Sequence, residues 1–387
     1  MNKRILVLGN NLIGSEVQAV GLARRCLLKL SQTNNIDFVR ILPSKWIQYL
    51  PTQIHQFVSN LIDDPYLGYD HKVIQHTLKT CQPDLIVGCG RSTVMLNRGI
   101  KQQHPHITTV QILNPYISSS HFDYIILPRH DTLPKESIEN NVLLMTGSIH
   151  NKTTDVLNDA RENVRLEHTE LYKMPLPRVA LLLGASHSTH CKYNSQQLEN
   201  SIIQIIKHVQ KCKGSILAIG SRRTPPENMQ RIRNVLIKSE CPHVSWSPCD
   251  TNIKDKDVNG KNAVPTKNPY VAVLALADAI VVTPDSITMT SEAISAKPLS
   301  GVHVMLSDVP SGKFRRFFEE IWETNKGDPK SDQKDVNQQT VLDLSNASSC
   351  VRRLKINAIS DANNDLDTIV ERIIHKLNKI YKVVQIK

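Results

Sequence analysis

A stretch of small, hydroxyl-bearing residues after a short apolar strand has the composition of an anion-binding turn. Ala279–Val282 is typical of a buried strand, Thr283–Ser286 of a polar turn, and the following segment, with Ser291 and Glu292, of a helix. Backbone N–H groups are free at a helix N-terminus, and the helix dipole favours an anion there. Glu292 lies about two turns into that helix, within reach of a ribose hydroxyl. The pattern indicates a phosphate or nucleotide site; an ordinary β-α-β unit with a polar loop is the alternative.

Two neighbouring arginines form a second candidate for anion binding. The apolar strand Ser215–Ile219 runs into Gly220 and then into the loop Ser221-Arg222-Arg223-Thr224-Pro225. Ligands of open α/β sheets bind beyond the carboxyl ends of parallel strands, and arginine binds phosphate oxygens in a bidentate way. The loop therefore predicts a phosphate contact, and a pair of solvated basic residues is the alternative.

Two glycine-punctuated turns in the first half of the chain have a similar position after a strand. The first runs from Gly9 to Gly14, and Gln18 follows it early in the next helix. It lacks the full G-x-G-x-x-G pattern of dinucleotide sites. The second contains Gly90 and Arg91, which offer close backbone approach and a cationic side chain. Both turns are candidates for the acceptor side of a site; a tight turn and a capped helix start are the alternatives.

Histidines supply candidate bases but no metal site. His130-Asp131 has the composition of an acid/base pair or of a turn residue with its cap, and His187 lies in a small, polar loop from Gly184 to His190. Spacing supplies no third ligand beside these histidines, and the eight cysteines form no C-x-x-C pair. We therefore predict no metal, no cofactor and reduced thiols, as in a cytosolic compartment.

The composition narrows the range of partners. The 387 residues carry a formal net charge of +11, which suits a phosphate-bearing ligand. Aromatic residues make up only 5% and do not alternate with basic ones, which argues against nucleic-acid binding. No apolar run approaches the length that spans a bilayer, so no transmembrane segment is expected.

Strands alternate with helices along most of the chain, which predicts an α/β fold with mostly parallel sheets and, at this length, two domains. Prolines 175 and 177 punctuate the chain between two such series. We expect an N-terminal Rossmann-like domain over residues 1–174, a C-terminal one over 175–365 with polar insertions near 250–267 and 325–339, and a last helix, 366–387, packing back. The strands that we expect are 5–8, 38–42, 85–88, 109–113, 124–127, 141–146, 178–183, 215–219, 243–246, 279–282 and 302–305.

The chain resembles a known family, the plant "elongated mitochondria" fission proteins and their bacterial homologues. The resemblance covers most of the chain apart from the two insertions, and its more specific blocks are SRRTP and NPY…LALADAIVVTPDS. It rests on Gly14 with Gln18, Gly21-Leu22-Ala23, Gly90-Arg91, Phe122-Asp123 through Pro128, His130-Asp131, Thr146-Gly147, Ser221 to Pro225, Asn268-Pro269-Tyr270, Leu274 to Asp278 and Thr283 to Glu292. The two charged insertions and the Asn-rich first turn depart from the family pattern.

The resemblance implies a fold similar to that of GT-B glycosyltransferases, with two Rossmann-like domains facing a cleft. It implies a nucleotide-diphosphate-sugar on the second domain, its diphosphate at the helix N-terminus and its ribose at Glu292. The residues that it assigns to this ligand are Ser221, Arg222, Arg223, Thr224, Thr283, Asp285, Ser286, Met289, Ser291 and Glu292.

Two roles follow from the resemblance. One is transfer of the sugar to an acceptor. The other is that of a non-catalytic adaptor that recruits a dynamin-like GTPase, in the cytoplasm and peripherally on the mitochondrial outer surface. Epimerase chemistry, for which these proteins were once named, ranks behind both because the Tyr-x-x-x-Lys pair that it uses is not found in a fitting context.

Overall fold

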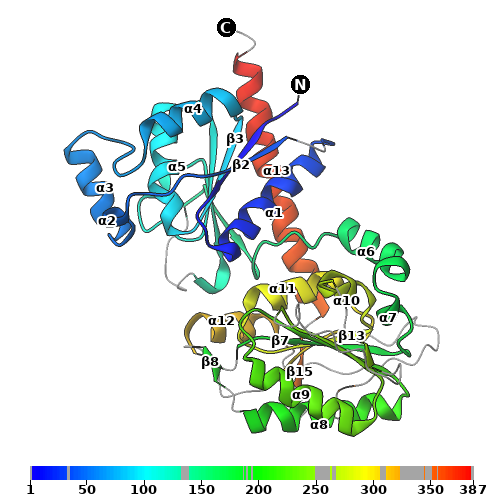
Figure 1. Ribbon diagram of the computed structural model, residues 1–387. Coiled ribbons are helices and arrows are strands. Elements are labelled where there is room, and N and C mark those ends of the chain that lie inside the picture. Colours follow the sequence, from blue (N-terminus) through cyan, green and yellow to red (C-terminus); the bar gives the residue numbers. More distant parts are fainter. Residues whose placement is uncertain are drawn as a thin grey trace. The chain divides into compact units, whose positions relative to one another are not determined.

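The chain forms two compact units, which are described one at a time (Figure 1). The computed structural model describes residues 2–32, 35–131, 139–185, 187–188, 191–192, 195–248, 262–263, 267–305, 311–322, 344, 351–354 and 356–384. Unit 1 comprises Met1–Asn151 and Asp361–Lys387, and unit 2 comprises Lys152–Ser360.

Unit 1 is built on a parallel sheet whose strands follow the order β2-β1-β3-β4-β5-β6. Every residue of β1, β3 and β4 is buried, as expected of apolar strands with helices on both faces of a sheet. Counted along the chain, this is the flavodoxin-like order, whose switch point lies between β1 and β3. The strands are β1 (Ile5–Gly9), β2 (Ile36–Arg40), β3 (Leu85–Cys89), β4 (Thr108–Ile112), β5 (Tyr124–Pro128) and β6 (Val142–Met145).

The helices of unit 1 include one from the far end of the chain. Helix α13 (Ile356–Val384) lays Leu366, Ile369, Val370, Ile373 and Leu377 into the same core as β1, β3 and α1. The helix is thus part of the covering of the first sheet. The other helices are α1 (Ile13–Lys29), α2 (Lys45–Gln48), α3 (Thr52–Leu61), α4 (His71–Cys81) and α5 (Arg91–Gln103), with short 3-10 turns η1 (Ser119–His121) and η2 (Arg129–Asp131).

Unit 2 has the strand order of a Rossmann fold. Its sheet runs β12-β11-β10-β7-β13-β14-β15 in the part of the chain that the structure describes. Counted from β7, the central strands follow the order 3-2-1-4-5, so the switch point lies between β7 and β13. The strands are β7 (Arg178–Leu183), β10 (Ser215–Gly220), β11 (His243–Trp246), β12 (Asn262–Ala263), β13 (Ala279–Val282), β14 (Val302–Met305) and β15 (Val351–Arg353), the last antiparallel to β14.

The helices of unit 2 include two that the sequence analysis assigns to the first domain. Leu157 and Val164 of α6 join the core that contains α10, and the guanidinium of Arg161 donates two hydrogen bonds, of 3.2 and 2.9 Å, to the carbonyl oxygen of Ala275. The chain therefore divides after Asn151, whereas the prolines suggest a boundary after residue 174. The helices are α6 (Thr154–Glu167), α7 (Thr169–Tyr172), α8 (Ser195–Lys211), α9 (Pro226–Ser239), α10 (Tyr270–Leu276), α11 (Ile287–Ala296) and α12 (Gly312–Ile321); β8 (His187–Ser188) and β9 (Cys191–Lys192) form a small separate pair.

The predicted fold class, α/β with two Rossmann-like domains, is confirmed by these two sheets. The predicted insertion 325–339 lies outside the described residues. Of the predicted insertion 250–267, the structure describes only residues 262, 263 and 267. Among the described helices, none combines the length and the apolar composition needed to cross a bilayer.

Candidate functional site

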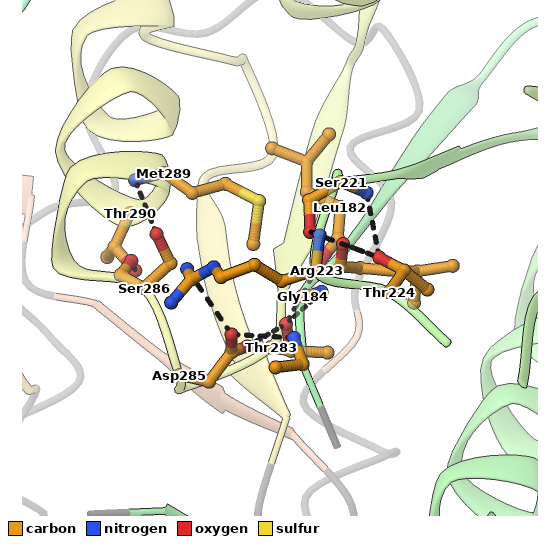
Figure 2. Close-up of polar contacts among 12 residues, drawn as sticks. Leu182, Gly184, Ser221, Arg223, Thr224, Thr283, Asp285, Ser286, Met289 and Thr290 are labelled. Carbon is orange, nitrogen blue, oxygen red and sulfur yellow. Dashed lines mark hydrogen bonds and ion pairs between the residues drawn. The ribbon is translucent and has the colours of Figure 1, made fainter. Parts of the chain in front are cut away.

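The carboxyl ends of β7 and β13 are joined by a buried network of polar groups at the switch point of unit 2 (Figure 2). The N–H of Gly184 donates to Thr283 Oγ1 at 2.8 Å, and the N–H of Ala185 donates to Asp285 Oδ2 at 2.8 Å. The Thr283 hydroxyl in turn donates to Asp285 Oδ1 at 2.6 Å. These bonds fix the loop after β7 against the turn after β13.

Asp285 holds this network from the inside. Burial raises the pKa of its carboxyl above the ordinary value, and the bonds from Thr283 and Ala185 with the charge of Arg223 counter only part of that rise. A side chain at position 184 would have no room, because a Cβ there would lie 2.1 Å from Asp285 Oδ1. Of the predicted ligand residues, Asp285 and Thr283 therefore shape the edge rather than line it.

The Ser221–Thr224 loop folds onto the same edge. The Thr224 hydroxyl donates to the carbonyl oxygen of Leu183 at 2.7 Å, and the N–H of Ser221 donates to Thr224 Oγ1 at 2.7 Å. Figure 2 shows Arg223 reaching from this loop toward Asp285, and the two form an ion pair of 3.5 Å. The side chain of Arg223 is nevertheless 56% exposed, so the guanidinium remains open to a ligand.

Arg222 differs from its neighbour in having no internal partner. Its side chain is exposed, and it makes no hydrogen bond or ion pair with any residue that the structure describes. An exposed arginine without a carboxylate beside it keeps its whole donor set for an anion. Arg222 could therefore contact a phosphate without giving up a bond to any residue that the structure describes.

Helix α11 begins at the same edge. Ser286 is its N-cap, and Ser286 Oγ accepts from the N–H of Met289 at 3.3 Å. Thr290 and Ser291 turn their hydroxyls back to the carbonyl oxygens of Ser286 and Ile287, at 3.0 and 2.8 Å. Side-chain bonding of this kind satisfies the helix, while the first N–H groups have no partner within it. The helix N-terminus is thus the part of α11 with N–H groups left over for an anion, and the Ser291 hydroxyl bonds within the helix.

Glu292 sits farther along α11, in a buried cluster of its own. The Tyr270 hydroxyl donates to Glu292 Oε2 at 2.6 Å, and Lys152 Nζ lies 5.9 Å from the centre of the Tyr270 ring. Burial raises the pKa of Glu292, and the tyrosine bond and the charge of Lys152 offset part of this rise. Burial and the facing carboxylate also raise the pKa of Tyr270 well above its ordinary value. Tyr270 thereby holds one oxygen of Glu292 in place.

In unit 1 an ion pair lies at the carboxyl ends of β1 and β2. Arg40, at the end of β2, donates to Glu16 through Nε at 2.8 Å and through a terminal nitrogen at 2.7 Å. Glu16 Oε1 also accepts the N–H groups of Asn10 and Asn11, at 3.0 and 2.8 Å. The Arg40 hydrogen bonds outweigh burial and lower the pKa of Glu16 to about 2. The pair ties the turn after β1 to the neighbouring strand.

The predicted acceptor-side residues lie around this turn. Gly90 has a φ of 80° and caps α5, with Ser15 Oγ only 3.2 Å from where its Cβ would be. Arg91 is exposed and donates to the carbonyl oxygen of Gln48 at 3.3 Å. Gly14 faces open space within α1, and Gln18 is half-buried on the same helix.

Two of the three candidate bases, His130 and Asp131, belong to unit 1. His130 is buried and Asp131 half-buried at the end of β5 in unit 1. The side chain of His187 and all of His190 lie outside the described residues. No group of His, Cys, Asp and Glu side chains that could hold a metal ion is found in the described ranges.

Sequence reasoning missed Tyr270 and Lys152 as partners of Glu292, and Arg40 as partner of Glu16. The second pair leaves a signal in the sequence, because an acid in the first turn after β1 faces a residue at the end of the adjacent strand. The contacts of Tyr270 and Lys152 around Glu292 leave no such signal, since Lys152 lies far from Glu292 along the chain.

Strand order, a serine-capped helix and an arginine loop at the switch point define unit 2 as a Rossmann-type α/β domain. The chain belongs to the Mitochondrial fission ELM1 family, whose model it matches over residues 13–355. Among its relatives are the "Mitochondrial fission protein ELM1" of Arabidopsis thaliana, 26% identical over 81% of each chain, and an uncharacterized protein of Rickettsia prowazekii, 27% identical over 76% of this chain and 82% of that one.

Solved structures that are similar at low identity include two enzymes. A UDP-GlcNAc 2-epimerase from Methanocaldococcus jannaschii is 15% identical, with a TM-score of 0.44 over 82% of this chain and 91% of that one. An alpha,alpha-trehalose-phosphate synthase (UDP-forming) from Burkholderia vietnamiensis is 10% identical, with a TM-score of 0.41 over 98% of this chain and 100% of that one.

Proposed function

We propose that unit 2 binds a nucleotide-diphosphate-sugar at the carboxyl edge of β10, β7 and β13. The observation that carries this proposal is the ion pair of Arg223 with Asp285, which joins the loop with the two arginines to the turn that leads into α11 at a Rossmann switch point. Both elements favour a diphosphate, one by charge and one by its N–H groups.

Glu292 would complete the ligand site on the nucleoside side. Tyr270 occupies Oε2 of the carboxylate, so Oε1 is the oxygen that accepts a ribose hydroxyl. A held carboxylate loses less conformational freedom on binding than a mobile one. Tyr270 is accordingly a positioning residue for the ribose contact.

Sugar transfer is the reaction that this arrangement serves. When the sugar leaves, negative charge grows on the diphosphate, and Arg222, Arg223 and the α11 N-terminus would stabilise it electrostatically. The acceptor would come from unit 1, at Gly14, Gln18, Gly90 and Arg91. We assign no base; His130, Asp131 and His187 are the candidates.

The test is calorimetric titration of the full chain with UDP-, GDP- and ADP-sugars, with free nucleotides as controls. Arg222→Ala should weaken binding of the preferred ligand about 10- to 100-fold, since a charge-assisted hydrogen bond is worth about 1.5–3 kcal/mol. Arg231→Ala is the matched control, because Arg231 is also exposed, on α9, without a partner among the described residues. No binding of any nucleotide-sugar, or equal loss in both variants, contradicts the proposal.

A second candidate function is that of an adaptor that recruits a dynamin-like GTPase on the mitochondrial outer surface. It is favoured by the name of the Arabidopsis relative. It is also favoured by the network at the edge of unit 2, because both oxygens of its acid, Asp285, already accept hydrogen bonds and the carboxylate is not open to act as a base. A variant with both Arg222→Ala and Glu292→Ala separates the two functions. Lost ligand binding with intact GTPase recruitment in a pull-down supports the adaptor; loss of both supports a ligand-dependent role.

A further inference from the structure

Helix α3 has its polarity reversed with respect to the interior of unit 1. Its buried residues are Thr52, His55 and Ser59, which are all polar. His55 Nε2 bonds to the carbonyl oxygen of Leu67 at 2.8 Å, and the Ser59 hydroxyl donates to that of Asp64. Helices of globular proteins normally bury an apolar stripe. In α3, polar side chains attach the helix to the rest of unit 1, and its apolar side chains face outward.

The outward side of α3 is a continuous apolar stripe. Ile54, Phe57 and Leu61 are exposed, the last two by 68% and 72%. Their spacing of three and four residues places them above one another on one face of the helix. Single exposed apolar residues are ordinary, but an aligned stripe marks a surface that meets another apolar phase.

Helix α2, just before α3 in the chain, adds aromatic side chains. Trp46 is 60% and Tyr49 82% exposed. Both residue types combine an apolar ring with a polar group, which suits the boundary between lipid chains and headgroups. Figure 1 shows α2 and α3 together at the outer side of unit 1, where α5 lies inside α3, and Arg98 of α5 donates to Asn60 at 2.5 Å. We call Trp46, Tyr49, Ile54, Phe57 and Leu61 the α2–α3 face.

Cations lie beside the α2 part of the α2–α3 face, whereas the acids Asp63 and Asp64 follow the end of α3. From Ile41 to Ile62 the chain carries no acidic residue, and Lys45 is its one lysine or arginine. Exposed Arg91 adjoins α2 through its bond to Gln48. The net charge of +11 adds long-range attraction toward an anionic surface. An apolar face with aromatic side chains and neighbouring cations has the composition of an interfacial membrane anchor.

We propose that the α2–α3 face docks unit 1 on an anionic lipid bilayer, with the stripe of α3 in the headgroup layer and Lys45 and Arg91 against lipid phosphates. Docking of this kind is reversible, since a short apolar stripe buries little area. It does not depend on the nucleotide-sugar site of unit 2, which is made by other residues.

Tryptophan fluorescence of the full chain tests this docking directly. The chain has three tryptophans, of which Trp246 is buried and Trp322 half-buried against Phe318, so Trp46 is the one open to lipid. Vesicles of phosphatidylcholine with phosphatidylglycerol should shift the emission to the blue, and phosphatidylcholine alone should do so less. Trp46→Phe should remove the shift while the protein still sediments with the vesicles.

Paired variants separate this face from general stickiness. Phe57→Ser with Leu61→Ser should weaken sedimentation with anionic vesicles at least about tenfold, because two apolar side chains are lost to the lipid. Leu166→Ser with Leu299→Ser is the matched control, since both leucines are exposed, by 84% and 75%, in unit 2.

Two results would overturn the proposal. One is that the full chain ignores anionic vesicles, or that both paired variants bind them as the unchanged chain does. The other is self-association, seen by analytical ultracentrifugation, that Phe57→Ser with Leu61→Ser abolishes while vesicles are never bound. The α2–α3 face would then join two copies of the chain.

Discussion

At the scale of residues, Asp285 is a buried carboxylate that positions its neighbours at the edge of the sheet in unit 2. It is buried, accepts from Ala185 and Thr283, and pairs with the exposed Arg223. A buried acid with a raised pKa is costly unless such partners satisfy it. The carboxylate therefore fixes the arginine that would meet a diphosphate.

This packing makes the glycine at 184 a sensitive position. We predict that Gly184→Ala destabilises unit 2 by about 1–3 kcal/mol, since the new methyl group would overlap the Asp285 carboxylate. Nucleotide-sugar binding should fall with it. Gly14→Ala is the contrast, because Gly14 lies in α1 with open space around it, and alanine should stabilise the helix by up to about 1 kcal/mol. Chemical denaturation measures both; equal effects would contradict the argument.

Residue types in the sequence point to candidate ligand contacts, but not to the residues that the fold brings together. SRRTP and the serine turn are predictable because arginine and a helix N-terminus carry their chemistry in their identity. Tyr270 and Lys152 are not, since their contact with Glu292 depends on how α6, α10 and α11 pack. The same holds for Asp285, whose inward direction no local pattern gives.

At the scale of elements, strands are predicted best because buried β-branched runs leave few alternatives. The eleven strands expected from the sequence all occur, with ends shifted by at most two residues. The largely apolar segment 46–62 forms two helices divided at Pro51, which cannot donate the hydrogen bond that a continuous helix needs. Strand β15 was not expected, because three residues with two arginines lack an apolar pattern, and β14 supplies its pairing.

The ion pair of Glu16 with Arg40 joins two elements of unit 1, α1 and β2, and its effect depends on pH. The folded pKa of Glu16, about 2, lies below its ordinary 4.5, so the pair stabilises unit 1 fully above pH 4.5. We predict that Glu16→Gln costs about 1–2 kcal/mol at pH 7, the lower end for a charged hydrogen bond because Arg40 is half-exposed.

The pH dependence of that cost provides the check. As pH falls from 4.5 toward 2, Glu16 becomes protonated and the difference between the unchanged chain and Glu16→Gln should vanish. The raised pKa values of Asp285 and Glu292 act in the opposite direction, but both proteins share them, so they cancel. Urea denaturation at a series of pH values measures the difference; a constant difference down to pH 2 would contradict the role of the pair.

At the scale of the whole molecule, each unit is a doubly wound sheet with polar groups at its switch point, yet only unit 1 is made from two distant parts of the chain. Helix α13 is held in unit 1 by its apolar side and by two groups of polar contacts. Asp365 accepts from Thr146 and Arg129, and Lys376 pairs with Asp123 at 2.8 Å. From the sequence we expect an amphipathic last helix that packs back, and the structure places it on the first sheet; the apolar stripe alone would fit either sheet.

We predict that a cavity under α13 weakens unit 1 and leaves unit 2 as it is. Ile373 is fully buried against the core of β1 and β3, so Ile373→Ala should cost about 2–5 kcal/mol. Hydrogen exchange should then show faster opening of β1 and β3, with β7 and β13 unchanged, because none of the α13 side chains that the structure describes joins the core of unit 2. His375→Ala, on the exposed side of the same helix, should change neither. Equal loss of protection in both sheets would mean that the two units unfold as one.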